Sequence, residues 1–186
     1  MHQALQRLFV FGALAAGAAG ADLPKPSPEL KVTLTTGQEF QLSSLRDKVV
    51  ALEFVFTTCP HCQQLVQTTD KVLREFEPRG FRAVAVACND GADLLAGEFA
   101  KQFGVTFPVG IGNVETMFTY IGTPPQPFRL PHLSFLDRKG MIQAQFTGEN
   151  PFFTDEEANM RKMVAQLLGP PPARTGKTKA SGNEKH

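Results

Sequence analysis

VVALEFVFTTCPHC, residues 49–62, joins a nearly unbroken apolar run to two cysteines that are separated by two residues. The run Val49–Phe56 predicts a central strand that is buried on both faces, since polar residues do not alternate along it. Apolar residues then recur at helical spacing from Pro60 to about Phe76, which predicts a helix that begins inside the cysteine motif. The sequence therefore places both thiols where a buried strand meets the N-terminus of a helix.

The position of Cys59 and Cys62 at a helix N-terminus has a chemical reason. The thiolate is the reactive form of cysteine, and the unpaired N–H groups and positive end of a helix stabilise an anion there. One helical turn then holds the second sulfur close enough to attack a mixed disulfide formed by the first. Pro60 suits the first helical position, which needs no backbone donor, and His61 can stabilise the Cys59 thiolate further. This spacing predicts a redox-active dithiol.

The composition fits a single globular domain. The chain has 186 residues, of which 42% are apolar and 16 are phenylalanine. It can therefore bury a stable core without disulfides or metal ions. A net charge of +1 without a basic stripe gives no indication of nucleic-acid binding. Three cysteines, two of them in the CxxC, are too few for a disulfide scaffold and leave Cys88 over. We expect a monomer.

The two ends of the chain differ in composition from its middle. Residues 1–21 combine Arg7, a short apolar core and small residues up to Ala21, which predicts a cleavable signal peptide. This core is shorter than the ~20 residues of a membrane span, so we expect membrane association only if the segment stays uncleaved. Residues 22–29 are typical of an extended linker, 30–168 of the domain and 169–186 of a disordered tail. We therefore expect a periplasmic or otherwise extracytoplasmic protein, where a CxxC meets an oxidising pool.

Hydrophobic patterns around the motif predict an α/β fold. Thr154 and Glu157 have the spacing of a capping box that opens a last helix, whereas three prolines make Thr116–Arg129 irregular. The order of the elements predicts a mixed sheet with helices on both faces and an N-terminal hairpin extension. The further expected elements are a hairpin over Leu30–Leu42 that turns on Gly37, a buried strand over Phe81–Cys88, a helix over Ala92–Phe103, an extended stretch over Val105–Ile111 and a hairpin over Leu133–Phe146.

Three further blocks of sequence accompany the CxxC. They are Gly37 with Leu42 and Leu45–Val50 ahead of the motif, Phe103–Val109 after it, and Leu130-Pro131 leading into Phe135–Gly140. With these blocks, residues 30–168 resemble the thioredoxin-like thiol–disulfide oxidoreductases of the TlpA/ResA (redoxin) type. The resemblance implies a thioredoxin fold and disulfide exchange with the thiols and disulfides of protein partners, and it implies no cofactor.

The resemblance also gives roles to residues outside the two cysteines. Pro131 falls where the family has a cis-proline that faces the dithiol, so Leu130 and Pro131, together with Pro60, are implied to contact the partner chain and to exclude a metal. Glu53 falls where thioredoxin has a buried acid. A carboxyl in so apolar a strand is implied to take or return the proton of Cys62.

The motif leaves the direction of electron flow open. The pair Pro60-His61 matches DsbA, which is a strong disulfide donor, whereas the rest of the domain resembles reductases. Family members usually have a tryptophan just before the first cysteine. Thr58 stands there in this chain, which contains no tryptophan, and this removes an apolar rim from the dithiol.

Other interpretations of the cysteines remain. The CxxC can be half of a zinc site, although only Cys88, His132 and scattered histidines remain as further ligands. It can also be a structural disulfide, although so short a loop gains little unfolded-state entropy. Cys88 ends a strand, where a small buried side chain is the default, and we expect His132 to lie near the dithiol as a bystander.

Two other protein classes share parts of this pattern. A Sco-type copper-binding assembly factor would use Cys59, Cys62 and His132, but such sequences have three residues between the cysteines. A thiol peroxidase would have threonine and proline where Phe56 and Leu52 stand. We therefore expect an exported thiol–disulfide oxidoreductase in which Cys59 forms the mixed disulfide and Cys62 resolves it.

Overall fold

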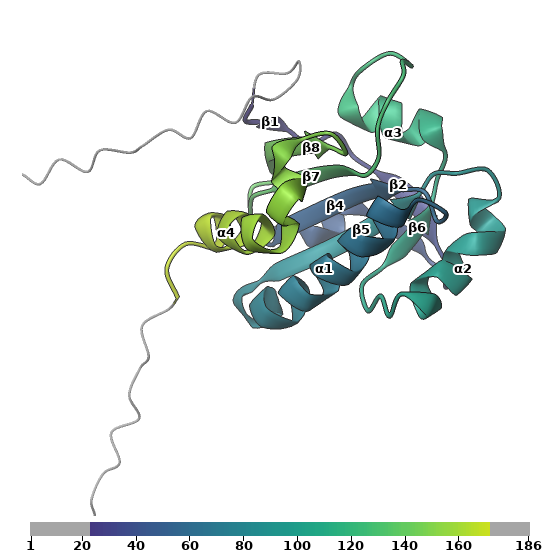
Figure 1. The fold of residues 1–186 in the computed structure, drawn as a ribbon. Coiled ribbons are helices and arrows are strands. Elements are labelled where there is room, and N and C mark those ends of the chain that lie inside the picture. The colour runs from purple at the N-terminus through teal and green to yellow at the C-terminus, as the bar shows by residue number, and fades with distance from the viewer. Residues whose placement is uncertain (1–22, 172–186) are drawn as a thin grey trace, which may run out of the picture.

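The computed structural model describes residues 23–171. The expected signal peptide, 1–21, and the expected disordered tail from residue 172 onward lie outside the described residues. Within them the chain forms one mixed sheet with the strand order β1-β8-β7-β4-β5-β6-β2-β3, and helices cover both faces of it (Figure 1). The predicted α/β class, the mixed sheet and the N-terminal hairpin are confirmed.

The elements follow the chain as β-β-β, β-α-β-α-β-α, then β-β-α. The strands are β1 (Lys25–Pro26), β2 (Lys31–Leu34), β3 (Glu39–Gln41), β4 (Val49–Val55), β5 (Phe81–Ala87), β6 (Val109–Ile111), β7 (His132–Leu136) and β8 (Met141–Thr147). The helices are α1 (Pro60–Phe76), α2 (Ala92–Gln102), α3 (Val114–Ile121) and α4 (Glu156–Leu168), with short 3-10 turns at Leu42–Leu45, Glu77–Arg79 and Pro151–Asp155.

Strand β4 lies at the centre of the sheet and is buried along its whole length. It pairs in parallel with β5 and antiparallel with β7. Its side chains alternate between the two faces. Ala51 and Val55 pack in a cluster with α1, α2 and α4, whereas Leu52 and Phe54 pack in a second cluster with α3 and the β2–β3 hairpin. Both faces of β4 are therefore covered, which explains why its sequence lacks polar alternation.

Helix α3 lies in a stretch that was predicted to be irregular, so that prediction is wrong for its first part. The side chain of Asn113 accepts the Thr116 N–H at 2.8 Å, and the Thr116 hydroxyl accepts the Asn113 N–H at 3.3 Å. This capping box begins the helix, and Gly122 ends it in the left-handed conformation (φ 74°). The prolines exclude regular structure only after Gly122.

Two boundaries near the chain ends also differ from prediction. Helix α4 begins at Glu156, after the 3-10 turn Pro151–Asp155, so the expected capping box of Thr154 with Glu157 is wrong. At the other end, the stretch 22–29, expected to be a linker, contains β1, which pairs with β8. A two-residue strand has too little pattern to be recognised in a sequence.

Substitution of Phe135 on β7 tests whether this residue lies in the larger core cluster. Its ring is fully buried and its centroid lies 6.2 Å from that of Phe146 and 5.9 Å from that of Phe152. Phe135→Ala is expected to lower the free energy of unfolding by about 3–5 kcal/mol, because it leaves a cavity. Leu94, which is 79% exposed, provides the control: Leu94→Ala should change it by at most about 0.5 kcal/mol. Equal effects in urea denaturation would contradict this core position.

Candidate active site

The turn between β4 and α1 carries the cysteine motif. Cys59 is the N-cap residue of α1 and has extended backbone (φ −86°, ψ 118°), and Pro60 is the first helical residue. The Cys59 N–H donates to the carbonyl of Phe56 at 3.1 Å, and the Cys59 carbonyl accepts the N–H of Gln63 at 3.0 Å. The end of β4 therefore places Cys59 at the N-terminus of α1, where the helix dipole stabilises a negative charge.

Two polar side chains outside the motif form hydrogen bonds to the backbone of this turn. The N–H of Thr57 donates to Asn89 Oδ1 at 2.8 Å, and the Gln63 side chain donates to the Thr57 carbonyl at 2.9 Å. Asn89 follows β5, so the neighbouring parallel strand helps to fix the turn. Sequence analysis missed Asn89, because a contact across the sheet leaves no local signal.

The two thiols differ in exposure. Cys59 is partly exposed and Cys62 is fully buried, and both are free. Burial raises the pKa of Cys62 well above its ordinary value, while a backbone hydrogen bond with Phe56 lowers it and the adjacent Cys59 thiol raises it further. The sulfur that a partner can reach is therefore that of Cys59, and its neighbour lies inside the protein.

Leu130 and Pro131 lie at the same end of the sheet. The Leu130–Pro131 peptide bond is cis, as the resemblance implies. Pro131 is buried and directly precedes β7, whose first residue, His132, pairs with Phe54 of β4. The topology therefore places Pro131 beside the end of β4 that leads to the cysteines. Contact of Leu130 and Pro131 with a partner chain stays a prediction.

A glycine that sequence analysis missed lies against this segment. A Cβ atom at Gly148 would overlap the backbone carbonyl of Leu130, and the Gly148 N–H donates to the carbonyl of Arg129 at 3.4 Å. Such close approach of two backbones requires glycine. In the sequence, Gly148 resembles an ordinary turn residue after a strand.

Glu53 is a fully buried carboxyl in β4. One oxygen accepts a hydrogen bond from the Thr69 hydroxyl on α1, and the other, Oε2, has no hydrogen-bond partner among the described residues. Burial raises the pKa of Glu53 to about 8, the Thr69 hydrogen bond opposes this, and the charge of Glu156 adds to it. The predicted burial is confirmed, and a carboxyl of this pKa can hold or release a proton near neutral pH.

His61 is exposed on the first turn of α1. It lines a hollow of about 390 Å³ together with Gln64, Glu156 and the segment between β8 and α4. The hollow lies beside the cysteine motif, so water has access to this side of the site. The predicted stabilisation of the Cys59 thiolate by His61 stays a prediction.

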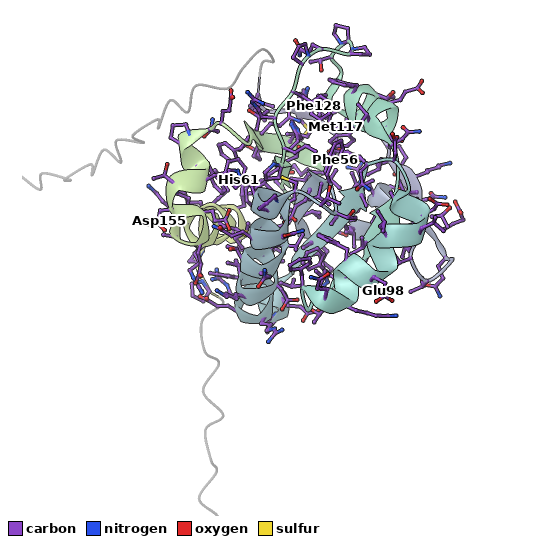
Figure 2. The ribbon with its side chains drawn as sticks, turned by 45° about the vertical axis from the view of Figure 1, so that its right-hand side comes forward. Phe56, His61, Glu98, Met117, Phe128 and Asp155 are labelled. Carbon is purple, nitrogen blue, oxygen red and sulfur yellow. The ribbon has the colours of Figure 1, made fainter. Side chains whose placement is uncertain are left out.

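An apolar hollow of about 420 Å³ is lined by α3, His132 and the loop that leads to Leu130. The ring of Phe128 meets Phe118 edge-on at 5.4 Å and Phe56 edge-on at 6.0 Å. Figure 2 shows Phe56 and Phe128 at one end of the molecule, near His61 at the start of α1. The absence of tryptophan therefore does not leave this end without aromatic surface, which the sequence had suggested.

Cys88 belongs to the core cluster on the α3 face of the sheet, and His132 packs against Phe54 of that cluster, whereas Glu53 accepts a hydrogen bond from α1. The His132 ring packs against Phe54 with centroids 6.1 Å apart, and burial lowers its pKa to about 4. Burial likewise raises the pKa of Cys88 to about 12. Across residues 23–171, no group of three or more His, Cys, Asp or Glu side chains is arranged to hold a metal ion. The ligand set of the copper alternative is therefore not assembled here.

Comparison with known proteins places this arrangement in a family. Residues 18–164 match the family described as Redoxin. The chain belongs to the redoxin family. This redoxin is 27% identical over 125 residues to thiol-disulfide oxidoreductase ResA of Bacillus thuringiensis (strain Al Hakam), covering 67% of the chain and 69% of that relative. It is 29% identical over 123 residues to ResA of Geobacillus kaustophilus (strain HTA426), covering 66% and 67%.

Solved structures agree with the fold. A putative thiol:disulfide interchange protein DsbE from Chlorobium tepidum aligns with a TM-score of 0.68 and 24% identity, covering 81% of the redoxin and 100% of that chain. A putative protein disulfide isomerase from Bacteroides thetaiotaomicron aligns with a TM-score of 0.65 and 23% identity, covering 79% and 90%. The predicted thioredoxin fold is confirmed. Family and relatives together make this redoxin a thioredoxin-like thiol–disulfide oxidoreductase of the TlpA/ResA type.

Gly148→Ala is expected to push the Leu130–Pro131 segment away from its position, because a Cβ has no room against Leu130. Reduction of insulin disulfides should slow several-fold, whereas alkylation of Cys59 by iodoacetamide should keep its rate, since the small reagent does not need that segment. Gly97→Ala on α2 is the control, because a Cβ there meets nothing within 4 Å. A parallel loss of both rates in Gly148→Ala would show a general folding defect instead.

The raised pKa of Glu53 predicts a pH dependence of stability. Because its pKa is about 8 in the folded state against an ordinary 4.5, the folded protein binds more protons than the unfolded one between these values. The free energy of unfolding should therefore fall as the pH rises through this window. Glu53→Gln should remove this fall, so its stability relative to wild type should grow by at most about 1.4 kcal/mol per pH unit.

Urea unfolding from about pH 5 to about pH 9 measures this difference. Glu115→Gln, which replaces an exposed carboxyl on α3, is the control and should show no such trend. A stability difference between Glu53→Gln and wild type that stays constant with pH would contradict the assignment.

Proposed function

We propose that this redoxin exchanges disulfides with protein partners through Cys59 and Cys62, in the periplasm or another extracytoplasmic compartment. The observation that carries the proposal is the different placement of the two sulfurs. Cys59 is partly exposed at the N-cap of α1, and Cys62 is buried beside it. A reachable sulfur can capture a partner, and an enclosed one can resolve only the disulfide that forms next to it.

In the reducing direction, the Cys59 thiolate attacks a disulfide of the partner. A bond forms between Cys59 and one partner sulfur, the partner disulfide breaks, and the other partner sulfur leaves with the electron pair and takes a proton. Cys62 then loses its proton and attacks the Cys59 sulfur, which releases the second partner thiolate and forms the Cys59–Cys62 disulfide. The dithiol is oxidised and the partner disulfide is reduced. Disulfide donation runs through the same steps in reverse.

Cys62 needs a base, because burial raises its pKa. Glu53 suits this role, since its pKa is about 8 and its Oε2 atom has no hydrogen-bond partner among the described residues. His61 and the helix N-terminus stabilise the Cys59 thiolate. Glu53 thus acts as the base for the buried Cys62, and His61 stabilises the thiolate of the partly exposed Cys59.

Pro60, Leu130 and Pro131 form the contact surface for an extended partner segment. Pro60 is exposed next to Cys59, and Leu130 is partly exposed. We propose that the backbone of Leu130 forms hydrogen bonds to the partner chain and that the Pro131 ring restricts access of a metal ion to the sulfurs. Protein thiols and disulfides are the partners, and no cofactor takes part.

The extracytoplasmic location is proposed from residues 1–21 and from the chemistry of the dithiol, which an oxidising compartment keeps available as a disulfide. In the segment from residue 23 to residue 171, no helix has the length and apolarity to cross a membrane. We propose separately that the protein attaches to a membrane only if its N-terminal segment stays uncleaved. We propose that the protein acts as a monomer.

Replacement of each cysteine tests whether Cys59 attacks the partner disulfide and Cys62 resolves the mixed disulfide. Cys59→Ser should abolish reduction of insulin disulfides by dithiothreitol, because the attacking sulfur is lost. Cys62→Ser should trap covalent complexes with partner proteins that disappear on treatment with reductant. Cys88→Ser is the matched control and should keep wild-type turnover, since Cys88 lies in the core cluster of the α3 face. Wild-type turnover in the Cys59→Ser or the Cys62→Ser variant would rule out the proposal.

A further inference from the structure

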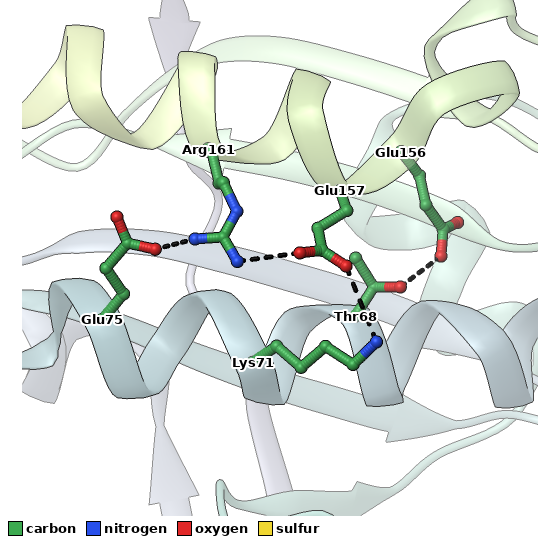
Figure 3. A network of polar contacts seen from close by, with 6 residues as sticks. All are labelled: Thr68, Lys71, Glu75, Glu156, Glu157 and Arg161. Atoms are coloured by element: carbon green, nitrogen blue, oxygen red, sulfur yellow. Dashed lines mark hydrogen bonds and ion pairs between the residues drawn. The ribbon is translucent and has the colours of Figure 1, made fainter.

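Two consecutive threonines of α1 each donate a hydrogen bond to a different buried carboxyl. The Thr69 hydroxyl donates to Glu53 on β4, and the Thr68 hydroxyl donates to Oε1 of Glu156 at 2.6 Å. Glu156 is the first residue of α4 and is only 7% exposed (Figure 3). Two carboxyls from distant parts of the sequence therefore reach adjacent residues of one helix.

The charged groups around Glu53 are few. Its charge interacts with Cys62 of α1 and with Glu156 of α4, and its neighbours on β5 and β7 are Ala85 and Leu133, which do not titrate. Asp70 on α1 is also buried, but its carboxylate pairs with the Arg74 guanidinium at 2.6 Å and accepts the Thr106 hydroxyl at 2.6 Å. Glu156 is thus the carboxylate whose charge Glu53 experiences.

Glu156 forms no ion pair with a side chain among residues 23–171. The Thr68 hydroxyl and the positive end of α4 both stabilise an anion there. The nearby cations Lys71 and Arg161 pair with Glu157 instead, at 3.6 Å and 2.8 Å, and Arg161 also pairs with Glu75 (Figure 3). Lys71 and Arg161 therefore form their ion pairs with other carboxylates at the surface between α1 and α4.

Glu156 lies at the wall of a hollow, whereas Glu53 is sealed inside the protein. Glu156 lines the hollow beside the cysteine motif together with His61 and Glu149, while Glu53 is fully buried. A carboxylate at the wall of a hollow can hold a charge that a sealed carboxyl cannot, because water solvates it. The two carboxyls therefore form an acidic pair in which only Glu156 lies at a hollow.

We propose that Glu156 is a positioning residue for proton transfer at Cys62, because its negative charge keeps the proton on Glu53 until Cys62 needs it. This inference rests on the proposed function. When the Cys59–Cys62 disulfide is attacked at Cys59, the S–S bond breaks, Cys62 leaves as a thiolate, and Glu53 gives it a proton. Glu53 then becomes a carboxylate beside Glu156. In the opposite direction, that carboxylate removes the Cys62 proton as Cys62 attacks Cys59, and repulsion from Glu156 makes it a stronger base.

The pH dependence of the Cys62 step tests the inference. Full-length reduced protein is mixed with 5,5′-dithiobis(2-nitrobenzoate). The first release of thionitrobenzoate reports attack by Cys59, and the second reports attack by Cys62 on the mixed disulfide. In Glu156→Gln, which keeps an acceptor for Thr68, the midpoint of the second step should move to lower pH by about one unit, the low end of shifts caused by a neighbouring charge.

Glu157→Gln is the matched control, because it removes the adjacent carboxylate, which pairs with Lys71 and Arg161 at the surface. Its midpoint should equal that of wild type. In a Glu53→Gln background, Glu156→Gln should produce no shift. A shift that persists in that background, or an unmoved midpoint in Glu156→Gln alone, would overturn the inference.

The same experiment separates this inference from the proposed function. If Cys62→Ser retains the second release, the proposed function fails. If Cys62→Ser loses it but Glu156→Gln leaves the midpoint in place, only the inference fails. Should Glu156→Gln not fold, ¹³C NMR titration of the side-chain carboxyls in wild-type protein decides. The Glu53 resonance should show two inflections, because two coupled carboxyls lose their protons in two steps, and a single-step curve would overturn the inference.

Discussion

The junction between β4 and α1 is the constraint on which the site depends. Strand β4 is paired on both sides and covered on both faces, so its end is fixed by the whole sheet. The positive potential of α1 extends only over its first turn. A sulfur that uses this potential must lie where strand and helix meet, as Cys59 does. One turn later the chain has entered the core, so the exposure of one cysteine and the burial of the other follow from helix geometry.

Buried ionisable groups lie on both faces of the sheet, but their surroundings differ. The Nε2 atom of His132 has both Ser134 Oγ and the Gln145 side chain at 3.4 Å. Glu53 has one oxygen paired and one without a hydrogen-bond partner among the described residues. A buried oxygen without a partner is costly, and such groups on the dithiol side are retained where chemistry uses them.

The sequence predicted those parts of the site that local pattern determines. The nearly unbroken apolar run identified β4, the CxxC marked the start of α1, and the resemblance located the cis bond before Pro131. Asn89 and Glu156 escaped prediction, because their roles depend on which strands and helices become neighbours. A polar residue at the start of a helix normally lies at the surface. Helix α3 was missed for another reason: the prolines after Gly122 obscured the local capping signal of Asn113.

The edges of the sheet have a consequence for a protein that handles other polypeptides. One edge is β1, which is two residues long, and Pro26 in it has no N–H to offer. The other edge is β3, which is three residues long and begins with the charged, exposed Glu39. Neither edge provides a long ladder onto which an unfolded chain could add a strand. Under the proposed function, this arrangement would favour covalent capture of a partner polypeptide at Cys59 over its pairing with a sheet edge.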